Sequence, residues 1–197
     1  MDRMTFQIIS LATIVCLVAA RALLLWFTIR VNAFKIAHWS DLWSVAGAAL
    51  FVLLLFREAR LIALPIPASM DTMIVNSGMI HRLGAAIAGV GILIFVLALL
   101  SFGNSWRVGI DTRTPGPLIT SGLFAFSRNP IFLFMDLYLA GTFLLNGRLV
   151  FLLIAFAGIL GLHRQILREE RFLSGHHGEA YQKYCARTPR YFRFFLP

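Results

Sequence analysis

Long stretches that almost lack charge constrain this chain more than any other feature of its sequence. Five apolar runs each contain at most one charged residue, and they cover residues 5–28, 41–56, 83–102, 131–145 and 149–162. A helix of about 20 apolar residues crosses the hydrocarbon core of a bilayer and satisfies its own backbone hydrogen bonds there. The runs therefore predict an all-α, polytopic membrane helical bundle of about five transmembrane helices.

The composition leaves room for little besides these helices. Only 14% of the 197 residues are charged and 59% are hydrophobic, whereas soluble domains have about 25% charged residues. We expect residues 1–102 to form a three-span N-terminal membrane bundle, and residues 103–197 to form a second region with a short helical hairpin and a polar tail. The third run carries small residues that favour close helix packing, namely Gly84, Ala85, Ala88 and Gly89.

The formal net charge of +9 points to lipid headgroups rather than to nucleic acid, because no nucleic-acid-binding motif accompanies it. Lys and Arg gather on the cytoplasmic side of membrane proteins. With the C-terminal tail in the cytoplasm, twelve of them lie inside and five outside, and Arg21 is within the first run. We expect membrane lipids as partners. Cys16 and Cys185 should lie at different depths, and no spacing is typical of a metal site, so we expect neither a disulfide nor a metal.

Two polar clusters flank the predicted hairpin. The first polar cluster is Ser-Arg-Asn-Pro at residues 127–130, and the second polar cluster is Arg-Glu-Glu-Arg at residues 168–171. The hairpin turns at residues 146–148, so antiparallel arms would bring both clusters to the same membrane face. The insertion at residues 103–128 is rich in Gly and Pro turn signals, and it is either a ligand cradle or a plain connecting loop.

The two acidic residues of the second polar cluster need a cationic partner beside an anionic leaflet. Glu169 and Glu170 could pair with Arg168 or Arg171 of the same cluster, or with a cationic ligand. We expect the last helix to continue past the membrane to about residue 173 and to end at Gly175.

Four short motifs follow one another in the C-terminal half. Residues 118–124 (LITSGLF) and 127–132 (SRNPIF) are followed by residues 169–173 (EERFL) and by the tail at 178–191. These motifs resemble, in order and spacing, the LVTSGxY, RHPxY, EExxL and GxxYxxY…RxPR motifs of isoprenylcysteine carboxyl methyltransferases. The chain is similar to a short, prokaryotic-type member of that family.

The resemblance implies a helical membrane fold that holds S-adenosylmethionine without a Rossmann domain. It implies cofactor contacts from Gly116, Pro117, Leu118, Ile119, Phe124, Asn129, Pro130, Ile131, Phe132 and Glu169. Arg128 and Glu169 are the implied catalytic residues, since a guanidinium can orient an anionic group and a carboxylate can hold the amino group of the cofactor. The implied location is the inner or plasma membrane of a prokaryote, or the endoplasmic reticulum of a eukaryote, with the site facing the cytoplasm.

The chain departs from the family motifs at two places. The His of RHP is Asn129, which cannot titrate near neutral pH, and the two motif tyrosines are Phe124 and Phe132. The substrate-binding Arg that precedes the first Glu by four residues is replaced by Gln165. Arg164 and Arg168 lie close by in the sequence, and with Gln165 they are the expected substrate-binding residues.

Methyl transfer does not require the missing His for every acceptor. A carboxylate or thiolate is already deprotonated, whereas an amine or alcohol needs a base. We therefore expect methyl transfer to a lipophilic or prenyl-linked substrate that enters from the bilayer, with the carboxylate of an isoprenylcysteine as one candidate. The alternatives are a phospholipid amine N-methyltransferase, an NADPH-dependent membrane reductase of the sterol-reductase type, and a non-catalytic lipid-binding protein.

Overall fold

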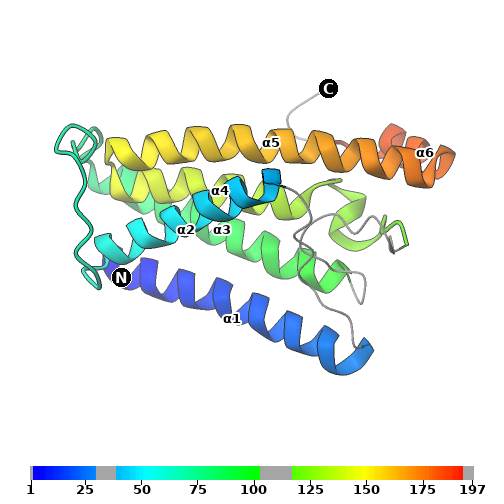
Figure 1. Cartoon of the computed structure of the whole chain (residues 1–197), viewed down its shortest axis with the longest axis horizontal. Coiled ribbons are helices and arrows are strands. Elements are labelled where there is room, and N and C mark those ends of the chain that lie inside the picture. The colour runs from blue at the N-terminus through cyan, green and yellow to red at the C-terminus, as the bar shows by residue number, and fades with distance from the viewer. Residues whose placement is uncertain (1, 30–38, 103–116, 193–197) are drawn as a thin grey trace.

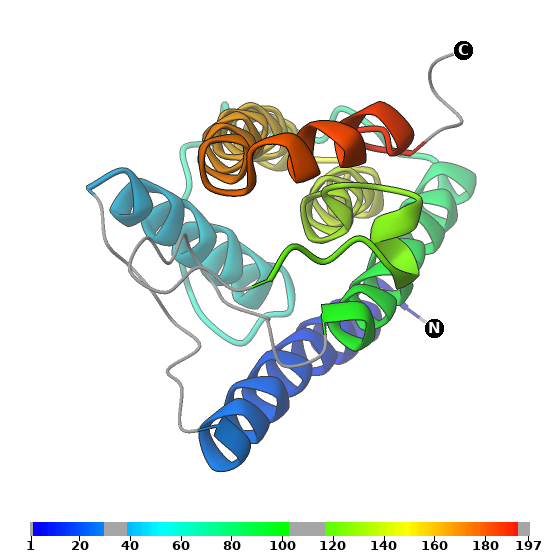
Figure 2. The same cartoon turned by 90° about the vertical axis from the view of Figure 1, so that its right-hand side faces the viewer.

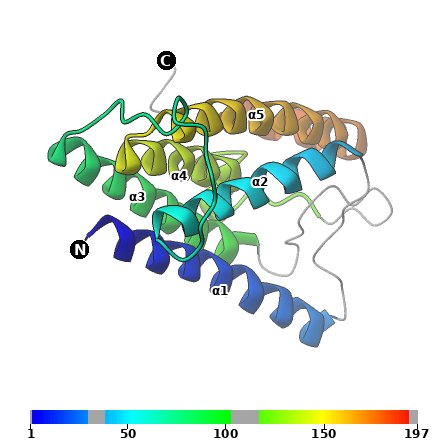
Figure 3. The same cartoon turned by 60° about the vertical axis from the view of Figure 1, so that its left-hand side comes forward.

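Five long helices alternate in direction in the computed structural model, which describes residues 2–29, 39–102 and 117–192, with side chains placed except at 28–29 and 39–45. The helices are α1 (Arg3–Ile29), α2 (Trp39–Glu58), α3 (Gly78–Phe102), α4 (Pro130–Asn146), α5 (Leu149–His177), the short 3₁₀ helix η2 (Gly122–Ala125) and α6 (Glu179–Arg187). Figure 1 shows them lying side by side, and Figure 3 shows α2 between α1 and α5.

The predicted membrane bundle is confirmed. Among the described residues, α1, α3 and α5 are long and apolar enough to cross a bilayer, and α4 is a shorter apolar helix. The second predicted run also forms a helix, α2, although its first side chains lie outside the described residues. The described part of the chain contains one isolated backbone bridge, Met73 to Arg148, and no strand.

Small residues bring α3 and α4 into direct contact. A Cβ atom at Gly84 would lie 2.5 Å from the backbone nitrogen of Leu145, and one at Gly141 would lie 2.6 Å from that of Ala88. This confirms the packing prediction for Gly84 and Ala88. It was wrong for Gly89, whose side of α3 has nothing within 4 Å, because that face of the helix points away from α4.

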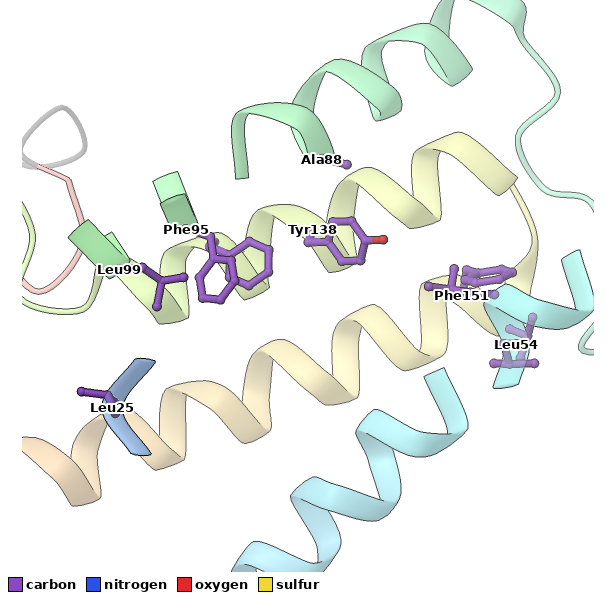
Figure 4. Close-up of a cluster of buried hydrophobic side chains, with 10 residues drawn as sticks. Leu25, Leu54, Ala88, Phe95, Leu99, Tyr138 and Phe151 are labelled. Atoms are coloured by element: carbon purple, nitrogen blue, oxygen red, sulfur yellow. The ribbon is translucent and has the colours of Figure 1, made fainter. Parts of the chain in front are cut away.

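The core between the helices is aromatic. Phe95 of α3 stacks on Phe134 of α4 with ring centroids 4.4 Å apart, and Phe51 of α2 meets the edge of Tyr138 at 6.1 Å. Figure 4 shows Phe95, Tyr138 and Phe151 following one another along the bundle. Burying such rings supplies most of the packing surface of a domain of this size.

Polar contacts mark one end of the bundle, which we call the turn end. Gly147 has a φ of 69° and ends α4, and a Cβ there would lie 2.0 Å from the carbonyl oxygen of Val75. The N–H groups of Ile74 and Val75 both donate to the Gly147 carbonyl, at 2.8 and 3.0 Å. Residues 70–75 thus pair with the predicted hairpin turn at 146–148, which is confirmed.

The opposite end, which we call the polar end, holds both polar clusters and α6. Helix α5 does not end at Gly175 as predicted but continues to His177, because the chain reverses only at Gly178, whose φ is 52°. Figure 2 shows α6 then crossing from α5 toward the start of α4. The predicted division of the chain after residue 102 stays a prediction.

Candidate active site

The first polar cluster is held by the segment that precedes it. Gly122, at a φ of 63°, lets the chain turn over the end of α3, where the Ser101 hydroxyl accepts the N–H of Leu123 at 3.0 Å. The following residue, Phe124, is buried and packs edge-on against Phe102 with ring centroids 4.5 Å apart. The approach to the cluster is therefore fixed by α3.

The C-terminal tail forms hydrogen bonds with the same segment from the other side. The Tyr184 hydroxyl donates to the Phe124 carbonyl at 2.6 Å, and the Arg128 N–H donates to the Pro189 carbonyl at 3.0 Å. The Ser127 hydroxyl, which is fully buried, donates to the Arg190 carbonyl at 3.3 Å. Burial raises the pKa of Tyr184 above its usual value, which keeps this hydroxyl a donor.

Glu170 joins the two polar clusters. Its carboxylate lies 3.3 Å from an Nη atom of Arg128 and 2.8 Å from one of Arg190, and it accepts the side-chain N–H of Asn129 at 3.2 Å. The prediction that both clusters meet at one end is confirmed. The pairing of Glu170 with Arg168 or Arg171 was wrong, because the antiparallel hairpin presents Arg128 directly opposite, and the tail adds Arg190.

Two guanidinium groups meet the Glu170 carboxylate. Only 12–13% of the Glu170 and Arg128 side chains is exposed, so solvent screens their interaction weakly. The hydrogen bonds to Glu170 raise the pKa of Arg190. Arg128 also donates to the Cys185 sulfur, while its Nε is buried without a hydrogen-bond partner. Burying a hydrogen-bond donor without a partner costs free energy. The Nε of Arg128 is therefore a candidate donor to an acceptor atom of a bound ligand.

The predicted cofactor residues gather at the polar end, apart from Gly116, which lies outside the described residues. Pro117 is exposed, whereas Leu118 and Ile119 are half-buried. Around the start of α4 the structure places three buried and two half-buried residues, namely Phe124, Asn129, Pro130, Ile131 and Phe132. Pro130 occupies the first turn of α4, where its missing N–H costs nothing.

The remaining predicted residues lie on α5. Glu169 is half-buried next to Glu170 and accepts a hydrogen bond from Gln165 at 3.3 Å. Arg164 is exposed and Arg168 is half-buried. The structure thus places the predicted substrate residues within one and a half turns of the acidic pair.

Sequence reasoning missed several side chains of the site. Arg190 and Cys185 were noted only as parts of the tail, although the RxPR motif already singled out Arg190. His163 was treated as a plain continuation of α5, yet its Nδ1 lies 3.1 Å from the hydroxyl of Tyr191. No sequence signal marked that pair, because its two members are 28 residues apart.

A helical membrane bundle with a polar site at one end is the architecture of the membrane methyltransferases that isoprenylcysteine carboxyl methyltransferases typify. A family model described as phospholipid methyltransferase matches residues 79–180, just over half of the chain. The chain therefore belongs to the phospholipid methyltransferase family, which is part of that wider group. It is an integral membrane methyltransferase. No curated protein matches it.

Proposed function

We propose that this protein transfers a methyl group from S-adenosylmethionine to the amine of a membrane phospholipid. The observation that carries the proposal is the meeting of Arg128, Asn129 and Glu170 at the polar end, inside the segment that the family model matches. The family description names phospholipids, and the departures at Asn129 and Gln165 remove two features expected of a prenylcysteine site.

The residues at the polar end fit the charges of S-adenosylmethionine. Its amino-acid part has one ammonium and one carboxylate group. Glu169 is the proposed partner of the ammonium, and the unpartnered Nε of Arg128 is the proposed donor to the carboxylate. The apolar segment with Leu118, Ile119 and Phe124 is the proposed wall of the adenosine part. When bound, the cofactor supplies an electrophilic methyl group.

The chain's own contribution is then alignment and exclusion of water. Displacement at a methyl carbon requires acceptor and leaving group in line, so positioning supplies most of the rate enhancement. The rigid start of α4, fixed by Pro130 and by the tail, holds one side of the site. We propose that the lipid enters sideways from the bilayer and the cofactor from the cytoplasm.

The first experiment is calorimetric titration of the purified protein in lipid nanodiscs with S-adenosylhomocysteine. We expect one-to-one, micromolar binding that weakens about tenfold in Glu169→Ala, the loss of one charge-assisted hydrogen bond. Glu179→Ala is the matched control, since Glu179 is exposed and pairs with Lys183 one helical turn away. No binding by folded wild-type protein would contradict the cofactor assignment.

The acceptor is tested with nanodiscs containing phosphatidylethanolamine, a farnesylcysteine analogue, or neither. Methyl transfer from labelled S-adenosylmethionine is expected with the first only. Methyl transfer to the farnesylcysteine analogue alone would mean that the methyl acceptor is a carboxylate and not an amine. A thermal shift with NADPH but none with S-adenosylhomocysteine would favour the reductase interpretation over methyl transfer.

A further inference from the structure

A second polar layer lies beneath the site, deeper in the bundle. Helices α4 and α5 are antiparallel, and Asn129 contacts Glu170 across them. Seven residues further along α4 is Asp136, and seven residues earlier on α5 is His163. Positions seven apart share a helix face, so this register places Asp136 opposite His163, about 10 Å below the first layer. A Cβ atom at Gly158 would lie 2.7 Å from Leu139, so α4 and α5 stay in close contact beyond this layer.

The tail reaches this second layer as well. The Tyr191 hydroxyl lies 3.1 Å from Nδ1 of His163, and the two rings stack with planes 17° apart. Burial raises the pKa of Tyr191, and the nearby charge of Asp136 raises it further. Tyr191 therefore contacts His163 and lies close enough to Asp136 for its charge to act on it. It follows directly after Arg190, which pairs with Glu170 in the first layer.

Asp136 has an unused acceptor. Its Oδ1 atom is buried and has no hydrogen-bond partner. A carboxylate oxygen removed from water without a donor is costly. Asp136 also shares the helix face of Asn129 and Phe132, two of the proposed cofactor residues, at spacings of seven and four residues. The unused oxygen thus belongs to the wall of the proposed site.

A lipid amine brings a proton that must leave before methyl transfer. Asn129 cannot take it, because an amide does not titrate near neutral pH. Glu170 is engaged by Arg128, Asn129 and Arg190, so its oxygens already have donors and do not face the amine unpaired. A base for this reaction must therefore come from elsewhere in the site.

We propose that Asp136 binds the ammonium group of the lipid acceptor and accepts its proton, and that His163 and Tyr191 carry that proton toward the exposed edge of the polar end. The inference rests on the proposed function and adds a catalytic residue to it. His163 and Tyr191 are positioning residues in this arrangement, because they act through Asp136.

The reaction then balances as follows. The ammonium gives one proton to the Asp136 carboxylate and becomes a neutral amine. The amine lone pair forms the new C–N bond as the S–C bond breaks, and that electron pair stays on sulfur, leaving a neutral thioether. The product is a methylated ammonium. Asp136 passes its proton to His163 and is ready for another cycle.

The charged and titratable groups around Asp136 are few in the described part of the chain. The register places His163 opposite it on α5, and Tyr191 of the tail, which contacts His163, lies where the charge of Asp136 acts on it. Arg190 and Glu170 are in the layer above. The positive charge of Arg190 is paired with Glu170, so it does not replace the ammonium as the partner of Asp136.

The test compares Asp136→Asn with wild type on two lipids in nanodiscs. One carries the ethanolamine headgroup, and the other carries an alkoxyamine in its place, which is already deprotonated at pH 7. We expect the variant to lose about 100-fold in kcat/KM on the amine lipid, as for loss of a general base. On the alkoxyamine lipid it should stay within about threefold of wild type. Glu179→Gln, the same chemical change at an exposed site, should affect neither rate.

Binding of S-adenosylhomocysteine is the readout of folding, and its dissociation constant should be unchanged in Asp136→Asn. If that variant does not fold, His163→Gln takes its place and should lower kcat about tenfold on the amine lipid only. Equal losses on both lipids would mean a structural role and overturn the inference, as would an unchanged rate on the amine lipid. Failure of wild type to bind S-adenosylhomocysteine or to methylate any amine would instead overturn the proposed function.

Discussion

The two ends of the bundle both hold a network of arginines and acids, yet the networks differ in balance. At the turn end, Arg57 and Arg148 pair with Glu58 and Asp71 at 2.6–3.3 Å, so two cations meet two anions. At the polar end, Arg128 and Arg190 both pair with Glu170. In the first network each arginine pairs with two acids, and in the second two arginines share one carboxylate.

The hydrogen bonds of individual arginine and aspartate atoms also differ between the two ends. Arg57 donates through Nε to the Leu64 carbonyl and through both Nη atoms to acids, and Arg148 also donates to the Asp71 carbonyl. At the polar end, Arg128 keeps a buried Nε without a partner, and Asp136 keeps a buried oxygen. An open depression of about 760 Å³ lies beside the turn-end network, but that network is already neutral. The turn end also holds a buried unpartnered atom, Nε2 of His81. The contrast therefore concerns the arginines: those of the turn end are matched by two acids, whereas Arg128 keeps an unpartnered donor.

The largest expected effect comes from breaking the polar-end network. Glu170→Ala removes the carboxylate that Arg128, Arg190 and Asn129 share, and breaking a buried pair in this way costs about 3 kcal/mol. We expect the thermal midpoint to fall and methyl transfer to drop by at least about 100-fold. Glu179→Ala serves as the control, since its pair with Lys183 is 70–78% exposed and contributes well under 1 kcal/mol. A stable, active Glu170→Ala protein would contradict this account of the site.

Helices α3 and α4 approach closely at Gly84 and Gly141, and we call this contact the seam. Because the two helices connect the turn end to the polar end, disturbing the seam should lower the stability of both. Gly84→Ala would place a Cβ 2.5 Å from backbone atoms of α4, and we expect a loss of about 2–3 kcal/mol, as for overpacking of a close interface. Gly89→Ala adds the same methyl group where nothing lies within 4 Å. It should be neutral or stabilising by up to about 1 kcal/mol. Equal melting temperatures for the two variants would argue against the seam.

Most of the helices could be predicted from the sequence, because an apolar segment in lipid must satisfy its backbone hydrogen bonds internally and therefore forms a helix. The start of α5 at Leu149 and the turn at Gly147 followed from one Gly between two apolar arms. The partners of Glu170 could not be predicted, since they depend on how the tail folds back over α4. The end of α5 was misplaced because Gly175 and Gly178 look alike in sequence, and only the second takes a positive φ.

The candidate site also has a part that could be predicted from the sequence and a part that depends on how distant segments pack. The antiparallel hairpin predicted that the two polar clusters meet at one end, and this is confirmed. The roles that the motif resemblance gave to Asn129 and Glu169 stay predictions. The second layer of Asp136, His163 and Tyr191 depends on the register between α4 and α5. Each of these residues is unremarkable within its own run, so no local pattern could have joined them.

Breaking the turn-end network should separate stability from function. Asp71→Asn removes a carboxylate that accepts from both Arg57 and Arg148, and hydrogen bonds to charged groups at partly exposed sites suggest a cost of about 1–2 kcal/mol. The dissociation constant for S-adenosylhomocysteine should not change, because the network lies at the other end of the bundle. Weaker binding of S-adenosylhomocysteine in this variant would mean that the two ends are coupled.

The smallest expected effect concerns the hinge that carries α6 to the site. Gly178 combines a φ of 52° with a ψ of −124°, a region that residues with a Cβ avoid, so Gly178→Ala should cost about 1–2 kcal/mol. Gly175→Ala, within the helix and with open space around it, should be neutral or slightly stabilising. Because α6 carries Tyr184, which binds the Phe124 carbonyl, Gly178→Ala should also weaken S-adenosylhomocysteine binding in calorimetry. Unchanged binding would mean that the tail keeps its place without this hinge.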